Sequence, residues 1–311
     1  MRYYTGLDVG GTSGRVLFEG TDGKKIGSFE GIGCAFNTDG PVIGKEKYSR
    51  LMREALGTFS LRAKDCAGVC AAASGVDSPK QADSLRDIFA SIGFAPDRVI
   101  VLNDCEVFLY LTDEPSMVVI SGTGSVCYGR NRAGQVFRTG GWNHILSDEG
   151  SAFWIGLQAV RAAAETMDGR RKADSLREKI CGICGFSTLE EADVWTTEHL
   201  NDKRTVGKLS AAVGKLAEEG DSESAAILRD AADQVFRLVQ DTFRKMYPQG
   251  RDEEEKPVRL WLWGSVCVKN PVFQNRLRER AAADLPVLNP AVPEQPALET
   301  ALRTAVNSFP C

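Results

Sequence analysis

The sequence predicts an α/β protein made of two similar lobes, and three observations lead to this class. Strand-like and helical patterns alternate through the first third of the chain. A strand, a glycine turn and a second strand occur twice, around Leu7–Ser13 and again around Ile120–Ser125. The chain has 311 residues, more than one hydrophobic core comfortably supports, which favours two lobes.

Five strands and two helices are expected in the first part of the chain, each from its periodicity of apolar residues. The expected strands are Tyr3–Val9, Val16–Phe18, Lys25–Phe29, Gly68–Ala73 and Val99–Asn103, and the expected helices are Lys45–Leu61 and Ala82–Ile92. From Met117 a second cycle begins, with strands at Met117–Ser121, Val126–Arg130 and Gln135–Thr139, the last two joined by a hairpin turn at Asn131–Gly134.

The rest of the chain is mainly helical. Apolar residues recur at intervals of three and four between Glu149 and Tyr247, as in a layer of amphipathic helices. The charged run Arg251–Pro257 predicts a solvated loop. A buried strand at Val258–Trp263 and helices at Pro271–Ala283 and Gln295–Val306 complete the expected elements.

Composition narrows the classes of function. Hydrophobic residues make up 43% of the chain and charged residues 26%, and the net charge is −4, so no positive field exists to attract nucleic acid or an anionic membrane. No apolar run reaches the roughly 18 residues of a membrane span, and the residues after Met1 do not resemble a signal peptide. Nine cysteines without an export signal indicate reduced thiols, so a cytoplasmic protein is expected.

The two glycine turns predict a nucleotide clamp. Their residues are Gly10, Gly11, Thr12 and Ser13 in the first and Gly122, Thr123 and Gly124 in the second. Backbone N–H groups and hydroxyls in such turns can surround an anion. Neither turn is a Walker loop, because no Gly-Lys-Ser/Thr follows. A single such turn is more often an ordinary hairpin, and it is the pair that favours phosphate binding.

An ordered set of motifs resembles the N-acetylglucosamine kinases, in a branch shared with the activator ATPases of benzoyl-CoA reductase and 2-hydroxyacyl-CoA dehydratase. The motifs are Asp8-Val9-Gly10-Gly11-Thr12, Asn103-Asp104, Ser121-Gly122-Thr123-Gly124-Ser125, Gly140-Gly141-Trp142-Asn143-His144, Asp148-Glu149-Gly150-Ser151 and Leu262-Trp263-Gly264-Ser265-Val266. The resemblance implies two actin-like (ribonuclease H-like) lobes with a nucleotide cleft between them. The implied boundaries are 1–116 and 117–294, with a helical insertion at about 150–248 and residues 295–311 packing on the first lobe. Relatives of the kinase type are commonly homodimers, which implies a homodimer here.

Phosphoryl transfer to an alcohol needs a base near the attacking hydroxyl and neutralisation of the phosphate charge. Asp104 follows the strand Val99–Asn103, and in the resembling kinases this aspartate takes the proton from the sugar 6-hydroxyl. A helix N-cap is the alternative for Asp104. Asp8, at the end of the first strand, is the candidate for holding Mg²⁺ beside the ATP phosphates, with a turn-stabilising role as the alternative.

Candidate contacts with the sugar are Trp142 and Asp148, because an indole offers an apolar face and a carboxylate accepts hydroxyl hydrogen bonds. The alternatives are a core position for Trp142 and a helix cap for Asp148. Asn37, Ser74 and Gly75 are weaker candidates, for which ordinary turn chemistry is the alternative. Gly264 and Ser265 are expected beside the adenine, where a residue larger than glycine would intrude.

These residues predict an ATP-dependent kinase for N-acetylglucosamine or a related amino sugar, such as glucosamine or N-acetylmuramic acid. One alternative is an activator ATPase, since activators of this branch bridge an iron–sulfur cluster between subunits with two cysteines from each. Cys127 matches one such ligand, but the region of the second, Ile145–Ser147, holds no cysteine, and Cys181 and Cys184 are expected to be free thiols. Another alternative is a nucleotide-binding protein without catalysis, since Asn143 and Ser147 replace glycines usual in the kinases.

Overall fold

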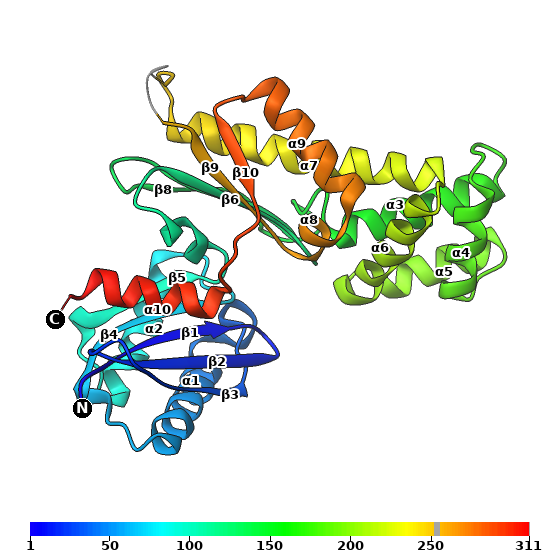
Figure 1. Cartoon of the computed structure of the whole chain (residues 1–311). Coiled ribbons are helices and arrows are strands. Elements are labelled where there is room, and N and C mark those ends of the chain that lie inside the picture. The colour runs from blue at the N-terminus through cyan, green and yellow to red at the C-terminus, as the bar shows by residue number, and fades with distance from the viewer. Residues whose placement is uncertain (252–255, 311) are drawn as a thin grey trace. The chain divides into compact units, whose positions relative to one another are not determined.

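A computed structural model describes residues 1–251 and 256–310 of the chain. The chain divides into two compact units, Met1–Asp113 with Pro293–Cys311, and Glu114–Val292, and Figure 1 shows both. Each unit is built on one five-stranded sheet with helices packed against it, which confirms the α/β class. None of the helices in the described residues is long and apolar enough to cross a membrane.

The sheet of the first unit has the strand order β3-β2-β1-β4-β5. Its strands are β1 (Tyr3–Val9), β2 (Ser13–Gly20), β3 (Lys25–Ile32), β4 (Cys66–Ala73) and β5 (Val99–Asn103). β1, β4 and β5 run parallel, whereas β2 and β3 are antiparallel to their neighbours. The alternation of buried residues such as Val16 and Phe18 on β2 places one apolar face of the sheet in the core.

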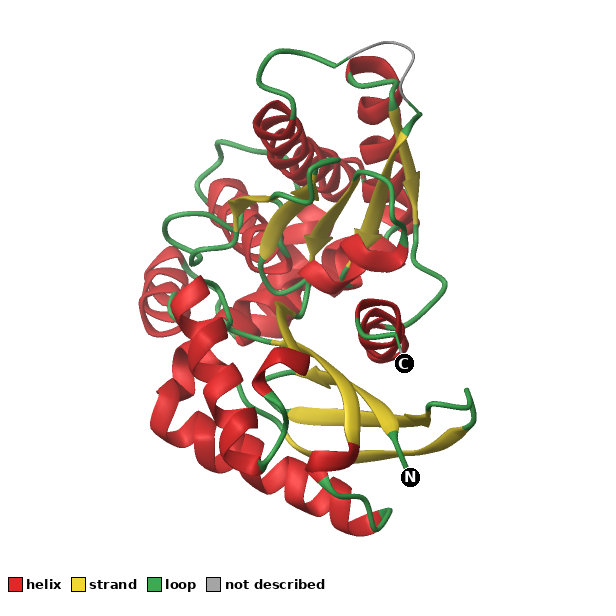
Figure 2. Cartoon of the chain, turned by 90° about the vertical axis from the view of Figure 1, so that its left-hand side faces the viewer, coloured by secondary structure: helices red, strands yellow, loops and turns green. Residues whose placement is uncertain are grey.

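Helices cover both faces of this sheet, as Figure 2 shows. The helices are α1 (Phe36–Thr58), α2 (Pro79–Ile92) and α10 (Ala297–Ser308), with short 3₁₀ turns η1 (Ala63–Asp65), η2 (Pro96–Arg98) and η3 (Glu106–Leu111). α10 packs across β1, where a Cβ on Gly6 would lie 2.3 Å from the backbone nitrogen of Leu302. Glycine at position 6 therefore allows this close approach of helix and strand.

The second unit repeats the topology of the first. Its sheet has the order β10-β9-β6-β7-β8, with β6, β9 and β10 parallel and β7 and β8 antiparallel to their neighbours. The strands are β6 (Ser116–Ser121), β7 (Ser125–Arg130), β8 (Val136–Gly140), β9 (Val258–Trp263) and β10 (Leu288–Ala291). β6 corresponds to β1 and β9 to β4, so the glycine turns after β1 and β6 occupy equivalent places.

The two units differ in the segment that follows the antiparallel strands. The first unit has α1 there, whereas the second has the expected helical insertion of α3 (Ala152–Met167), α4 (Asp174–Cys184), α5 (Leu189–His199), α6 (Lys203–Glu218) and α7 (Ser222–Met246). α8 (Ser265–Lys269) and α9 (Pro271–Asp284) follow β9. Buried residues of α7, such as Val235 and Val239, pack in one core with Val119 of β6.

Two sequence predictions about elements need correction, and a third is largely untested. α1 begins at Phe36, before the expected Lys45, and it contains a break at Gly40 (φ 73°) ahead of Pro41. Proline ordinarily opens a helix, and the left-handed conformation of Gly40 allows one helical turn to precede it. The short strand β10 was not expected. The loop expected at Arg251–Pro257 lies largely outside the described residues.

Candidate active site

The parallel strands of the first unit end in register at one edge of its sheet. Val9 pairs with Ala73, and Ala73 pairs with Asn103. The residues that follow these strands, Gly10, Ser74 and Asp104, therefore leave the sheet side by side. This edge, at the carboxyl ends of parallel strands, is where α/β sheets bind ligands.

Asp104 is a partly buried carboxyl group at this edge. Burial raises its pKa above the usual range, the negative charges of Asp8 and Asp77 raise it further, and hydrogen bonds from Cys105 and Ser74 oppose the rise. The Cys105 thiol lies 3.3 Å from Asp104 Oδ1. Asp104 caps no helix, because η3 starts at Glu106 after Cys105 and has no side-chain cap. A carboxylate with a raised pKa is a better proton acceptor than an ordinary surface aspartate.

Asp77 joins three segments around this edge, although no local sequence motif marks it as a site residue. Its Oδ1 accepts a hydrogen bond from Asn103 Nδ2 and its Oδ2 accepts one from Asn37 Nδ2, each at 3.2 Å. Asn37, Ser74 and Gly75 are thereby brought together. Gly75 has φ 76°, and a Cβ there would lie 2.6 Å from the backbone nitrogen of Asn37. Glycine is required at position 75 for this contact.

The first glycine turn is a tight connection between β1 and β2. Gly10 N–H donates to the carbonyl of Ser13 at 3.0 Å, while Gly11, Thr12 and Ser13 are exposed. Gly33 packs directly against this turn, where only glycine fits, because a Cβ at this position would lie 2.3 Å from Ser13 N. The exposed N–H groups and hydroxyls of this turn can bind an anion.

Asp8 forms an ion pair with Arg15, the residue paired with it on β2. Only 16% of the Asp8 side chain is exposed, compared with 48% of Arg15. Arg15 therefore balances the charge of a carboxylate that lies at the same edge as Asp104.

The second glycine turn connects β6 and β7. Gly122 N–H donates to the Gly124 carbonyl at 3.0 Å, and Thr123 is exposed. Gly264, which follows β9, has φ 91°, and a Cβ there would lie 2.3 Å from the Ser121 carbonyl oxygen. The need for glycine at position 264 thus arises from its contact with the end of β6, in addition to any approach of a ligand.

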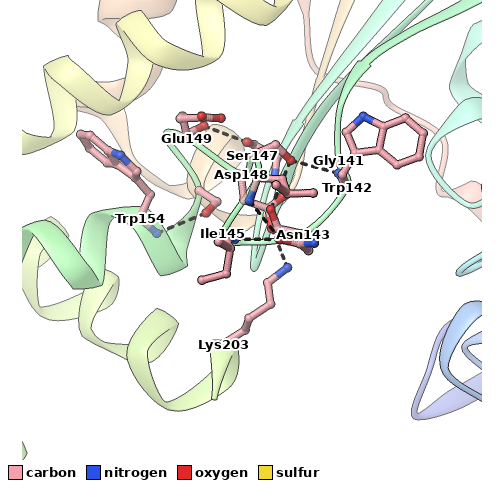
Figure 3. Close-up of polar contacts among 12 residues, drawn as sticks. Gly141, Trp142, Asn143, Ile145, Ser147, Asp148, Glu149, Trp154 and Lys203 are labelled. Carbon is pink, nitrogen blue, oxygen red and sulfur yellow. Dashed lines mark hydrogen bonds and ion pairs between the residues drawn. The ribbon is translucent and has the colours of Figure 1, made fainter. Parts of the chain in front are cut away.

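Asp148 is buried behind the second turn, with 3% of its side chain exposed. Its Oδ1 accepts a hydrogen bond from Ser125 N–H at 3.0 Å, and its Oδ2 lies 2.6 Å from Lys203 Nζ (Figure 3). Gly124 packs against the carboxylate, since a Cβ there would lie 2.7 Å from Oδ1. Asp148 has φ 73°, which is uncommon for a residue with a side chain. It is not a helix cap, because Ser151 caps α3 through a bond from Trp154 N–H.

Trp142 lies on the loop that leads to Asp148, but the two side chains are not brought together. The indole is 69% exposed and is directed away from the Asp148 carboxylate (Figure 3). The Arg138 guanidinium lies 4.6 Å from the centre of an indole ring. Trp142 is therefore not a core residue, and its exposed surface remains available to a ligand.

Asn143 and Ser147 hold the loop that carries Trp142. Asn143 Oδ1 accepts hydrogen bonds from Ile145 N–H at 2.9 Å and Leu146 N–H at 3.0 Å. Ser147 Oγ accepts one from Trp142 N–H at 3.0 Å. The residues that replace the glycines usual in the resembling kinases thus supply side-chain acceptors that order the loop.

Two adjoining cavities lie beside the second glycine turn, within the second unit. One, of about 250 Å³, is lined by Thr123, Ala152, Lys203, Arg204, Gly207, Lys208, Ser210 and Ser265. The other, of about 390 Å³, shares Ser210 and Ser265 with the first and includes the apolar residues Ile155, Leu228 and Val266. A basic compartment and a partly apolar compartment meet at Ser265. This arrangement suits a ligand with an anionic tail and an apolar ring.

Lys203, Arg204 and Lys208 are further functional candidates, which lie outside every motif found in the sequence. All three belong to α6, and they line the cavity that contains Thr123. In sequence, Lys203 is 55 residues from Asp148, and no local motif connects the two. The available signal was the scarcity of basic residues in the glycine turns, which implied that cations would come from elsewhere in the chain.

The cysteines considered as metal ligands lie apart from these sites. Cys127 is fully buried in the core of the second unit, and burial raises the pKa of its thiol to about 12. Cys181 and Cys184 are free and partly buried at the end of α4. His144 packs edge-on against Phe153, which is consistent with a structural role.

Comparison with known proteins identifies relatives over most of the chain. The N-acetylmuramic acid/N-acetylglucosamine kinase of Clostridium acetobutylicum is 30% identical over 241 residues, which cover 77% of this chain and 78% of that protein. The N-acetyl-D-glucosamine kinase of Dictyostelium discoideum is 24% identical over 274 residues, 85% of each chain.

Solved structures share the fold. A Chromobacterium violaceum protein provisionally described as an N-acetylglucosamine kinase matches with a TM-score of 0.73 at 22% identity, over 98% of this chain and 99% of that one. Glucokinase of Balamuthia mandrillaris matches with a TM-score of 0.51 at 17% identity, over 98% and 93% of the two chains. These likenesses confirm the expected actin-like, two-lobe fold.

A family model matches residues 5–289, which include both glycine turns, Asp104, Asp148 and Lys203. The matched segment spans most of both units. The chain belongs to the BadF/BadG/BcrA/BcrD ATPase family.

Proposed function

We propose that this protein is an ATP-dependent amino-sugar kinase that transfers the γ-phosphoryl group of ATP to the 6-hydroxyl of N-acetylglucosamine or a related sugar, such as glucosamine or N-acetylmuramic acid. The observation that carries the proposal is Asp104, a carboxyl group of raised pKa at the carboxyl ends of parallel strands, beside Asp8. The names of the two relatives described above support an amino sugar as the acceptor.

In this proposal the nucleotide binds in the two adjoining cavities of the second unit. The adenine lies near Ile155, Leu228 and Val266, in the apolar compartment. The phosphates lie near Thr123 and the basic side chains of α6, which neutralise their charge. Ser265 lines both cavities, and Gly122 and Gly124, the neighbours of Thr123 in the second glycine turn, are further proposed contacts of the nucleotide. Gly10, Gly11, Thr12 and Ser13 of the first unit are also proposed phosphate-binding residues, because their turn offers exposed N–H and hydroxyl donors.

Asp104 accepts the proton of the sugar 6-hydroxyl as the oxygen attacks the γ-phosphorus atom. Asn37, Ser74 and Gly75 lie around the same strand ends and are proposed contacts of the sugar. Trp142 offers an exposed indole to the sugar ring, and Asp148 is a further proposed contact.

The residues at this edge suit a divalent cation. Asp8 and Asp104 are close enough for the charge of one to raise the pKa of the other, and a hard cation with oxygen ligands relieves such repulsion. We propose Asp8 as the residue that holds Mg²⁺, through water. When bound, the ion would offset negative charge on the phosphates.

A coupled assay of ADP release tests the proposal across a panel of hexoses and amino sugars. We expect turnover that depends on an amino sugar and on Asp104, with Asp104→Asn losing it while still binding nucleotide. ATP hydrolysis that no sugar stimulates, together with a brown, iron-containing protein after anaerobic purification, would favour an activator instead. The burial of Cys127 disfavours it as a ligand of such a cluster.

The expected homodimer stays a prediction, which analytical ultracentrifugation tests.

A further inference from the structure

The carboxylate of Asp148 has a cation in the place where a sugar hydroxyl is expected to bind. Lys203 Nζ lies 2.6 Å from Asp148 Oδ2, and Ser125 N–H donates a hydrogen bond to Asp148 Oδ1. Only 3% of the Asp148 side chain is exposed. A sugar hydroxyl group that approaches the buried Oδ2 therefore competes with the ammonium group of Lys203.

Lys203 is placed to have a second partner. It lines the same 250 Å³ cavity as Thr123, and Arg204 and Lys208 give that cavity further positive charge. Of the Lys203 side chain 32% is exposed, so it has room to change its rotamer. A phosphate group beside Thr123 would compete with Asp148 for the ammonium group, because both are anionic oxygen acceptors.

We propose that Lys203 exchanges Asp148 for a phosphate group of the nucleotide, and that this exchange frees Asp148 Oδ2 to accept a hydrogen bond from the sugar. The inference rests on the proposed kinase function and deepens it. Asp148 and Lys203 are then the residues that couple the two substrates, and each substrate stabilises the arrangement that the other needs.

The coupling follows from the burial of Asp148. A buried carboxylate that loses its counter-ion is strongly disfavoured unless another donor replaces the lost partner. Nucleotide alone therefore does not separate Lys203 completely from Asp148. When sugar alone is present, Lys203 still occupies the Asp148 carboxylate. When both are present, the phosphate takes the ammonium group and the sugar hydroxyl takes Oδ2. The two substrates bind more tightly together than separately.

Isothermal titration calorimetry tests the proposal with N-acetylglucosamine and the β,γ-imido analogue of ATP in the presence of Mg²⁺. The measured quantity is the ratio of sugar affinities with and without the analogue. For the unaltered protein we expect a ratio on the order of 5 to 150. For Lys203→Met we expect a ratio near one, because Asp148 is open to the sugar in both states. Lys203→Arg, which keeps the charge, should restore coupling.

Two further variants make the test specific. Lys208→Met removes a cation from the same cavity without touching Asp148, so it should weaken binding of the analogue and leave the ratio as in the unaltered protein. Asp148→Asn keeps an acceptor for Ser125 but releases Lys203, so the analogue should bind more tightly without sugar and the ratio should fall to near one. If Lys203→Met does not fold, the ratio measured for Asp148→Asn tests the exchange of Lys203.

The outcomes separate this inference from the proposed function. If the unaltered protein phosphorylates the sugar but its ratio is near one, or if Lys203→Met keeps the ratio of the unaltered protein, the exchange of Lys203 is refuted and the kinase stands. If no sugar binds or is phosphorylated, the kinase function fails, and this inference fails with it.

Discussion

Ala73 of β4 pairs with Asn103 of β5 across parallel strands, so the next residue of each strand, Ser74 and Asp104, leaves the sheet at the same edge. The pairing explains why a hydroxyl group and a carboxyl group separated by 30 positions in sequence interact, with Ser74 donating a hydrogen bond to Asp104. Parallel strands in register convert positions that are remote in sequence into one site.

Asp104→Asn should reduce the kcat of sugar phosphorylation by roughly 10²- to 10⁴-fold, because the amide cannot accept the hydroxyl proton. Affinity for nucleotide should stay within about threefold, since Asp104 is proposed to contact the sugar and not the nucleotide. Steady-state kinetics and calorimetry measure the two effects. Asp97→Asn, an exposed change in η2 of the same unit, is the control. Retention of kcat in Asp104→Asn would remove Asp104 as the base.

Gly75→Ala should destabilise the first unit by about 3 kcal/mol or more, since it combines an unfavourable positive φ with a steric clash against Asn37. Gly134→Ala is a matched control, because Gly134 also has a positive φ (78°) but a Cβ there meets nothing within 4 Å. The control should lose only about 1 kcal/mol. Urea unfolding measures both, and equal losses would show that the contact with Asn37 is unimportant.

Much of the fold could be predicted from local sequence. The bounds of β1, β5 and β9 agree with the prediction, because each is a short apolar run rich in β-branched or aromatic residues and bounded by turn signals. β10 was missed because it has only four residues, one of them Pro290. The start of α1 was missed because Gly40 and Pro41 are typical of a loop, although a helical turn precedes them.

The candidate site could be predicted only where its residues lie in local motifs. The glycine turns and Asp104 follow strands, so their positions at a sheet edge follow from the strand pattern. Lys203 and Asp77 could not be assigned, because their roles depend on partners 55 and 26 to 40 positions away. The contact between Gly124 and Asp148 likewise depends on how the loop after β8 folds back. Such pairings are set by tertiary packing, and single-sequence patterns do not contain them.

Asp8→Asn should raise the Mg²⁺ concentration needed for half-maximal activity by about tenfold or more, because a neutral amide oxygen is a weaker partner for a hard cation and its water shell. Arg15→Gln should lower that concentration, because Arg15 competes with the cation for the Asp8 carboxylate. Titration of activity with Mg²⁺ measures both. Asp22→Asn, on the exposed turn between β2 and β3, is the control. The proposal requires that this Mg²⁺ concentration rise in Asp8→Asn and fall in Arg15→Gln.

Glu106 gives the protein a characteristic pH dependence of stability. Burial raises the pKa of its carboxyl from 4.5 to about 7, and the hydrogen bond from Asn103 N–H only partly opposes the rise. Between these two pH values the folded protein holds a proton at Glu106 that the unfolded chain has lost. The free energy of unfolding therefore falls as the pH rises through this range.

Glu106→Gln removes this dependence while keeping an acceptor for Asn103 N–H. Relative to the unaltered protein, the variant should gain about 3 kcal/mol of stability between pH 4 and pH 8, from the difference between the two pKa values. Urea unfolding at a series of pH values measures the gain. Glu190→Gln, an exposed change of the same charge in α5, should leave the slope unaltered. If Glu106→Gln has the same slope as the unaltered protein, the Glu106 carboxyl titrates normally, and the strand-end region around Asn103 is more hydrated than its burial indicates.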